Sequence, residues 1–149
     1  MSLRITAGAY RGRTIHTVPG QAVRPSPAML REALFNIIGP RIAGRRFLDL
    51  CAGSGAVGIE ALSRGAAHAT FVDNHPASLS VIRRNLEALG VLPRATILRR
   101  DAAHAPADLA RRAERFDVAF LDPPYDTGTV ASCKLAGGLR VIIPARCRL

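Results

Sequence analysis

The stretch from Phe47 to Gly58 constrains the fold of this chain more than any other part of the sequence. It opens with an apolar run, 47–50, which predicts a short buried strand. Glycines follow at Gly53, Gly55 and Gly58, a spacing typical of a sharp turn that leads into a helix packed closely on the strand. Because the backbone N–H groups at such a helix start can bind a ligand, the stretch predicts a small-molecule site, although a plain structural turn has the same spacing.

After this stretch the chain repeats the pattern of strand, turn and helix. We expect strands at 47–50, 69–72, 95–98 and 116–121, helices at 56–64, 76–89 and 106–115, and room for one further strand at 139–143. Strands that alternate with helices predict a parallel α/β sheet with right-handed crossovers.

The first 46 residues follow a different pattern. Apolar and polar residues alternate at 3–7 and 13–18, which predicts a β-hairpin. A connector rich in proline follows, and Ser26 is placed to cap a helix that begins at Pro27 and stops at Gly39. The apolar stripe of this helix is expected at Leu30, Ala33, Leu34, Ile37 and Ile38, with Arg31 off the stripe. We therefore expect an N-terminal extension, 1–46, and an α/β domain, 47–149.

Length and composition fit one soluble domain. The chain has 149 residues, 48% of them hydrophobic, and no apolar run long enough to cross a membrane. Its N-terminus lacks the apolar core of a signal peptide, so we expect a cytoplasmic protein. Three cysteines without C-x-x-C spacing and four scattered histidines indicate neither a disulfide framework nor a metal site.

The net charge of +10 is concentrated at the N-terminus, where 1–46 holds eight arginines and one acid. The arginines are Arg4, Arg11, Arg13, Arg24, Arg31, Arg41, Arg45 and Arg46. Guanidinium groups match phosphate oxygens, so this region predicts nucleic-acid binding. Solubility and the arginine bias of a high-GC genome are the alternative, because the chain has a single lysine.

Four carboxylates fall at or just beyond the ends of the predicted strands. They belong to Asp49, Asp73, Asp101 and Asp122. Ligands of open α/β sheets bind at this edge. Aspartate also caps turns and helices, and for Asp101 alone that simpler role is favoured.

The turn and these carboxylates leave two cofactor classes open. A dinucleotide would place its pyrophosphate on the turn and a ribose at Asp73, twenty residues after Gly53. Asp49 would then lie near the pyrophosphate and repel it. S-adenosylmethionine lacks phosphate and carries an ammonium and a sulfonium that Asp49 can face, so the residues favour S-adenosylmethionine.

The motif Asp122-Pro123-Pro124-Tyr125 follows the fourth predicted strand. Two prolines fix the backbone and leave acceptors, the Asp122 carboxylate and the Pro123 carbonyl. Such acceptors can orient the exocyclic amine of a nucleobase and stabilise the positive charge that develops on it during methyl transfer. Tyr125 can stack on the base. A rigid turn after an edge strand is the structural alternative.

Several segments together resemble the bacterial guanine-N(2)-methyltransferases, which methylate the exocyclic amine of a guanine in small-subunit (16S) ribosomal RNA. The matching segments are Arg4-Ile-Thr-Ala-Gly8, Arg11-Gly-Arg13, Arg24-Pro25, Arg31-Glu-Ala-Leu-Phe-Asn36, Phe47-Leu-Asp-Leu-Cys-Ala-Gly-Ser-Gly55, Glu60-Ala-Leu-Ser-Arg-Gly-Ala66 and Phe120-Leu-Asp-Pro-Pro-Tyr125. The helix segment after Arg-Pro is the most specific of them. The resemblance implies a Rossmann-like class I methyltransferase sheet that binds S-adenosylmethionine.

The resemblance also implies roles for individual residues. The cofactor would be held by Asp49, Ala52, Gly53, Gly55, Asp73, Asn74, Asp101 and Ala102. The catalytic residues would be Asp122, Pro123, Pro124 and Tyr125. Ribosomal RNA or the small ribosomal subunit would contact Arg4, Arg11, Arg13, Arg24 and Arg31. We expect a monomer that requires no metal and no membrane.

Two departures from the family stand out. Ser26, Ala28 and Met29 replace the usual threonine, aspartate and arginine of the connector. The domain is incomplete after about residue 126, because such folds continue for some sixty residues past this point, and a truncated or frameshifted reading frame is our hypothesis. The competing functions are an adenine amino-methyltransferase acting on DNA or RNA, a nucleotide-dependent oxidoreductase and a non-catalytic RNA-binding remnant.

Overall fold

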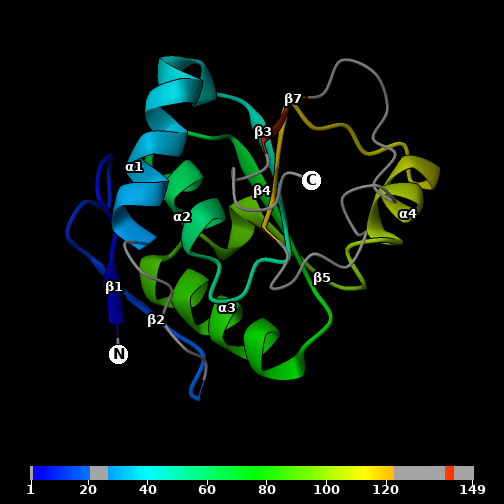
Figure 1. Cartoon of the computed structure of the whole chain (residues 1–149), viewed down its shortest axis with the longest axis horizontal. Helices are drawn as coiled ribbons and strands as arrows, with labels where there is room; N and C mark the ends of the chain where they lie inside the picture. The colour runs from blue at the N-terminus through cyan, green and yellow to red at the C-terminus, as the bar shows by residue number, and fades with distance from the viewer. Residues whose placement is uncertain (1, 21–26, 123–139, 143–149) are drawn as a thin grey trace.

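The computed structural model describes residues 2–20, 27–122 and 140–142, and its centre is a five-stranded sheet (Figure 1). The strand order is β5-β4-β3-β6-β7, and all four neighbouring pairs are parallel. The strands are β3 (Arg46–Leu50), β4 (His68–Asp73), β5 (Ala95–Arg99), β6 (Val118–Leu121) and β7 (Arg140–Ile142). The predicted parallel α/β sheet is confirmed, and so is the additional strand expected at 139–143.

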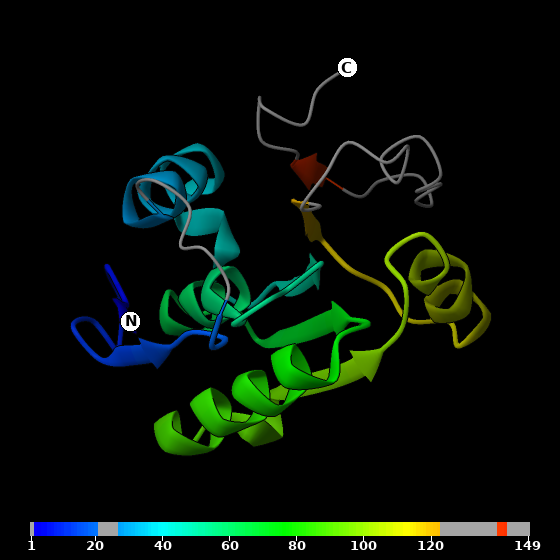
Figure 2. The ribbon, with the colours of Figure 1, turned by 60° about the horizontal axis from the view of Figure 1, so that its bottom comes forward.

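Helices cover both faces of the sheet because alternate strand residues point to opposite sides. Phe47, Phe71 and Phe120 face one side and pack with α1 (Pro27–Ile38), α2 (Ala56–Ser63) and α3 (Pro76–Leu89). Leu48 and Leu121 face the other side and pack with α4 (Ala105–Arg111), which stands apart from the remaining helices in Figure 2. Two short 3-10 helices, Gly39–Ile42 and Leu92–Arg94, lead into β3 and β5.

Most expected boundaries agree with the structure to within two residues, and one helix differs more. The helix expected at 106–115 ends at Arg111 instead. Ala113 has a left-handed backbone with φ 56°, which a continuing helix does not allow. The next strand accordingly begins at Val118, two residues later than the apolar run indicated.

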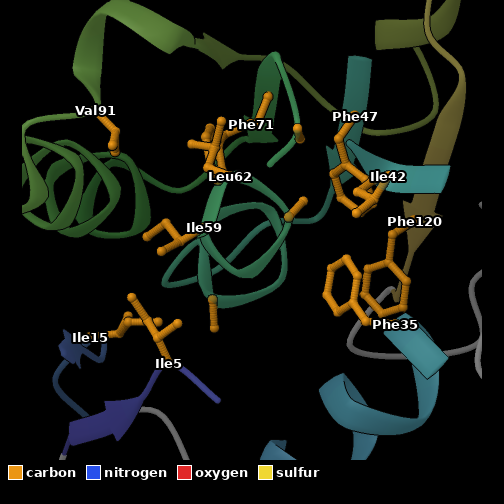
Figure 3. Packing of buried hydrophobic residues seen from close by; sticks show 14 of the residues in the cluster. Ile5, Ile15, Phe35, Ile42, Phe47, Ile59, Leu62, Phe71, Val91 and Phe120 are labelled. Carbon is orange, nitrogen blue, oxygen red and sulfur yellow. The ribbon is translucent and has the colours of Figure 1, made fainter. Parts of the chain in front are cut away.

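The N-terminal residues form the predicted hairpin. Strands β1 (Ser2–Arg4) and β2 (Thr14–His16) pair antiparallel, with Leu3 opposite Ile15. Ile5 and Ile15 are buried in the same hydrophobic cluster as Ile59 of α2, toward which they point in Figure 3. The extension and the sheet therefore share one core.

The buried face of α1 differs from the expected stripe. Leu34, Phe35 and Ile38 are buried, whereas Ile37 is 74% exposed, so the apolar stripe is rotated by about one position. Phe35 packs against Phe47 of β3 with ring centroids 6.1 Å apart. The same rotation places Arg31, expected at the surface, on the buried face with 2% exposure. The expectation that Arg31 contacts RNA is therefore wrong, because its side chain is enclosed between α1 and α2.

Arg31 is buried because Glu60 of α2 is its partner. The Glu60 carboxylate is fully buried and accepts hydrogen bonds from Arg31 Nε at 3.3 Å and from the backbone N–H of Thr6 and Ala7 at 3.0 and 3.1 Å. Arg64 Nε lies 3.4 Å from the same carboxylate. Burial lowers the pKa of the Arg31 guanidinium and Glu60 raises it again. One carboxylate thus joins the hairpin, α1 and α2.

We predict that Glu60→Leu destabilises the fold by about 3–5 kcal/mol, because it leaves the Arg31 charge buried without its partner. Urea unfolding of the wild type and the variant measures the difference. The matched control is Arg31→Met combined with Glu60→Leu, which removes both charges. The double variant should be more stable than Glu60→Leu alone, and a Glu60→Leu protein as stable as the wild type contradicts the role of this ion pair.

Candidate functional site

The glycine turn connects β3 to α2 at the carboxyl edge of the sheet. Gly53 and Gly55 have left-handed φ values of 58° and 82°, and the Ala52 N–H is 2.9 Å from the Val72 carbonyl of β4. At Gly58 a Cβ atom would lie 2.4 Å from the Phe71 ring, so only glycine fits between α2 and β4. The sharp turn and the close helix packing predicted from the glycine spacing are both confirmed.

Asp49 lies beneath this turn. Its side chain is 1% exposed, and its Oδ2 accepts a hydrogen bond of 3.0 Å from the Gly58 N–H, in the first turn of α2. The pKa of Asp49 is raised to about 7, chiefly by burial, with smaller contributions from the negative charges of Asp73 and Asp122 and an opposing one from the Gly58 N–H. The site therefore contains a carboxyl group that holds a proton up to about neutral pH when no cation is near.

Asp73 is the last residue of β4 and Asp122 directly follows β6, the two strands that flank β3. Asp73 Oδ2 accepts the Gly53 N–H and its Oδ1 accepts the His75 N–H, both at 2.9 Å, so this carboxylate fixes the turn and the start of α3 together. Asp122 comes directly after β6 and is 8% exposed. Three carboxylates from neighbouring strands thus lie at the carboxyl edge of the sheet, and Asp73 and Asp122 both act electrostatically on Asp49.

The other residues expected to hold the cofactor are placed as follows. Asp101 is exposed after β5, and its Oδ1 accepts the Ala103 N–H at 2.9 Å, as expected for a carboxylate that stabilises a turn. Ala102 is buried against the cluster beneath α4, Ala52 is partly exposed in the turn, and Asn74 is exposed after β4. Pro123, Pro124 and Tyr125 lie outside the described residues.

The arginines expected to contact RNA are not in equivalent positions. Arg4, Arg11 and Arg13 are exposed on the hairpin. Arg4 Nη1 donates to the Gly12 carbonyl, and Arg13 Nη2 donates to the Ala88 carbonyl near the end of α3, both at 3.1 Å. Arg24 lies outside the described residues, and Arg31 is buried as described above.

Two features of the site were missed in the sequence. Cys51 has a left-handed φ of 59°, uncommon for a residue other than glycine, at the junction of β3 and the turn. No sequence pattern indicates this. Asn85 of α3 reaches the carbonyl of Ser54 within the turn. Its position three residues after buried Ile82 places it on the buried helix face, and a polar residue there was the available signal.

Residues 2–20, 27–122 and 140–142 contain no cluster of three or more His, Cys, Asp or Glu residues that is arranged to hold a metal ion. No helix in the same ranges has the length and apolar character needed to span a membrane.

The site fits a cationic cofactor better than a dinucleotide. The Gly58 N–H, which a pyrophosphate at the start of α2 would need, is already occupied by Asp49. A buried carboxyl with a raised pKa beside two further carboxylates is stabilised by a positive charge, which S-adenosylmethionine carries. A parallel sheet of this order with a glycine turn after β3 is the fold of the class I S-adenosylmethionine-dependent methyltransferases.

Comparison with known proteins identifies the family. The family model described as "Conserved hypothetical protein 95" matches residues 3–137, and the chain belongs to this family. It is 42% identical over 123 residues to "Putative rRNA methyltransferase YlbH" of Bacillus subtilis, and 36% identical over 126 residues to "Ribosomal RNA small subunit methyltransferase D" of Escherichia coli. These alignments cover 83% and 85% of this chain but only 67% and 62% of the relatives.

A solved structure supports the same assignment. The structure of "Putative methyltransferase yhhF from Escherichia coli" superposes with a TM-score of 0.80 at 33% sequence identity. The match covers 96% of this chain and 81% of that one.

We predict that Asp49→Asn removes a pH dependence of stability. The native pKa of Asp49, about 7, lies above the unfolded value near 3.8. Between pH 3.8 and pH 7, Asp49 is therefore protonated in the native state and ionised in the unfolded state. The stability contributed by protonated Asp49 is thus present at low pH and is lost as pH rises from about 4 to 7, by up to about 4 kcal/mol. Urea unfolding at several pH values measures this loss.

The Asp49→Asn protein should therefore gain stability relative to the wild type as pH rises from 4 to 7. The control is Asp117→Asn, at an exposed carboxylate just before β6. The difference in stability between Asp49→Asn and the wild type should grow with pH by more than the difference between Asp117→Asn and the wild type. A difference for Asp49→Asn that does not change with pH would contradict the raised pKa.

Proposed function

We propose that this chain is an S-adenosylmethionine-dependent methyltransferase of ribosomal RNA, and that it methylates the exocyclic amine of a guanine in small-subunit (16S) RNA. The observation that carries the proposal is the buried Asp49 carboxyl beneath the glycine turn, which bonds to the Gly58 N–H and is acted on electrostatically by Asp73, itself bonded to Gly53, and by Asp122. The names of the relatives support ribosomal RNA as the substrate. The assignment of a guanine amine as the target is inferred from the resemblance of the sequence segments to the guanine-N(2)-methyltransferases.

The cofactor would be held between the glycine turn and the ends of β3, β4 and β5. Asp73, already fixed by the Gly53 and His75 N–H groups, has lone pairs left to accept ribose hydroxyls. Asp49 would face the positive charge of the cofactor. The rest of the cofactor would be bordered by Asn74, Asp101 and Ala102. When bound, S-adenosylmethionine supplies a methyl group on a positively charged sulfur, which an amine can accept.

The target amine would be oriented by the loop that follows β6. An exocyclic amine is a poor nucleophile because its lone pair is delocalised into the ring. The Asp122 carboxylate and the Pro123 carbonyl would accept hydrogen bonds from its two N–H groups, which fixes its direction and stabilises positive charge during transfer. Tyr125 would stack on the base. This arrangement requires no covalent nucleophile.

The RNA would be bound by arginines of the N-terminal extension. Arg4, Arg11 and Arg13 are exposed on a hairpin that is fixed to the core, so their guanidinium groups are presented on a rigid element. Arg24 belongs to the same basic region of the sequence. We further propose that the protein acts in the cytoplasm as a monomer and without a metal ion.

We predict that Asp122→Asn lowers methyl transfer at least about a hundredfold while the protein keeps its affinity for S-adenosylmethionine within a few fold, because the lost charge acts on the amine. The assay measures transfer of labelled methyl groups to unmethylated small-subunit particles, free 16S RNA and duplex DNA. Asp117→Asn is the matched control, because it changes a carboxylate at the opposite end of β6.

Transfer to a guanine amine of the RNA or the particle is expected, with none to DNA. Transfer to adenine would replace the guanine assignment. Binding of RNA without any transfer would overturn the enzymatic function of the chain.

A further inference from the structure

One buried side chain connects the N-terminal hairpin to the glycine turn. Asn85 lies on α3 and is 1% exposed. Its Oδ1 accepts the His16 N–H of β2 at 2.9 Å, and its Nδ2 donates to the His16 carbonyl and to the Ser54 carbonyl, both at 3.0 Å. Strand β2 and α3 are adjacent in Figure 1, and the hydrogen bonds of Asn85 join the extension to the sheet domain.

The hydrogen bonds of Asn85 leave its amide a single orientation. The His16 N–H requires an acceptor, so the amide oxygen must face it, and the two carbonyl groups require donors, so the nitrogen must face them. Both hydrogens of Nδ2 are used. A rotation of the amide by 180° would set oxygen against oxygen, and the backbone of β2 therefore fixes the donor that reaches Ser54.

Ser54 lies in the middle of the glycine turn. It stands between Gly53 and Gly55, whose backbones have wide conformational freedom. The Gly53 N–H is held by Asp73, and the Gly55 N–H bonds to the Ala52 carbonyl at 2.8 Å. The bond from Asn85 fixes the Ser54 carbonyl, and with it the peptide plane that leads to Gly55.

We propose that Asn85 is a positioning residue that holds the cofactor turn in its binding conformation and links it to the N-terminal hairpin. Asn85 acts through Ser54 and does not touch the cofactor. Ordering of the hairpin strengthens cofactor binding, and cofactor binding stabilises the hairpin in return, because such linkage is reciprocal. The inference rests on the proposed function for the identity of the cofactor.

The first test compares Asn85→Ala with Leu89→Ala. Leu89 lies one turn further along α3, is also buried and does not form the bridge between His16 and Ser54, so its loss destabilises the helix packing alone. Calorimetric titration with S-adenosylmethionine is done well below both melting temperatures. Asn85→Ala should raise the Kd about fivefold or more, whereas Leu89→Ala should leave it within about twofold of the wild type.

The second test uses the unmodified chain and does not depend on how well the variants fold. S-adenosylmethionine should slow hydrogen exchange of the His16 amide, which bonds to Asn85. The Gly44 amide, which bonds to the Gly65 carbonyl outside the hairpin, is the internal reference and should change less.

The outcomes separate this inference from the proposed function. Equal Kd values for the wild type and Asn85→Ala, or an unchanged His16 exchange rate on binding, would overturn the inference alone. An unmodified chain that does not bind S-adenosylmethionine would overturn the proposed function and the inference with it.

Discussion

The burial of Asp49 in the central strand is the constraint on which the site depends. A carboxylate inside the sheet must be paired or protonated, and the Gly58 N–H supplies only one hydrogen bond. Gly58 can approach it because it has no side chain to meet Phe71. The glycine spacing therefore does more than form a turn. It brings the start of α2 over a buried carboxyl group that a positively charged ligand stabilises.

Much of the fold follows from local sequence patterns, and contacts between distant segments do not change these elements. The parallel sheet, the hairpin and the helices that begin at Pro27 and Pro76 were all predictable, because apolar periodicity, proline and glycine mark them directly. The carboxylates at the strand ends were also predictable, since in a parallel sheet the residues that follow the strands gather at one edge.

The rest depended on contacts between segments far apart in the chain. The buried face of α1 could not be predicted, because the partners of buried Arg31 are distant in the sequence: Glu60, 29 positions away, and the Arg4 carbonyl, 27 positions away. The link from Asn85 to Ser54 spans 31 positions and joins two residues that no single pattern connects. The left-handed backbone of Cys51, at the junction of β3 and the turn, has no counterpart in the sequence pattern. The periodicity of apolar residues indicates which face of an element is buried. It does not indicate which distant polar residues form hydrogen bonds once the chain has folded.

The most direct test of a cationic cofactor site is calorimetric titration of the protein with S-adenosylmethionine between pH 5.5 and 7.5, in buffers of different ionisation enthalpy. A cation near Asp49 lowers the pKa of a carboxyl that otherwise titrates at about 7. Binding below pH 7 should therefore release a proton, and the affinity should rise by about tenfold or more across this range. Binding without proton release and with a constant affinity would contradict the account.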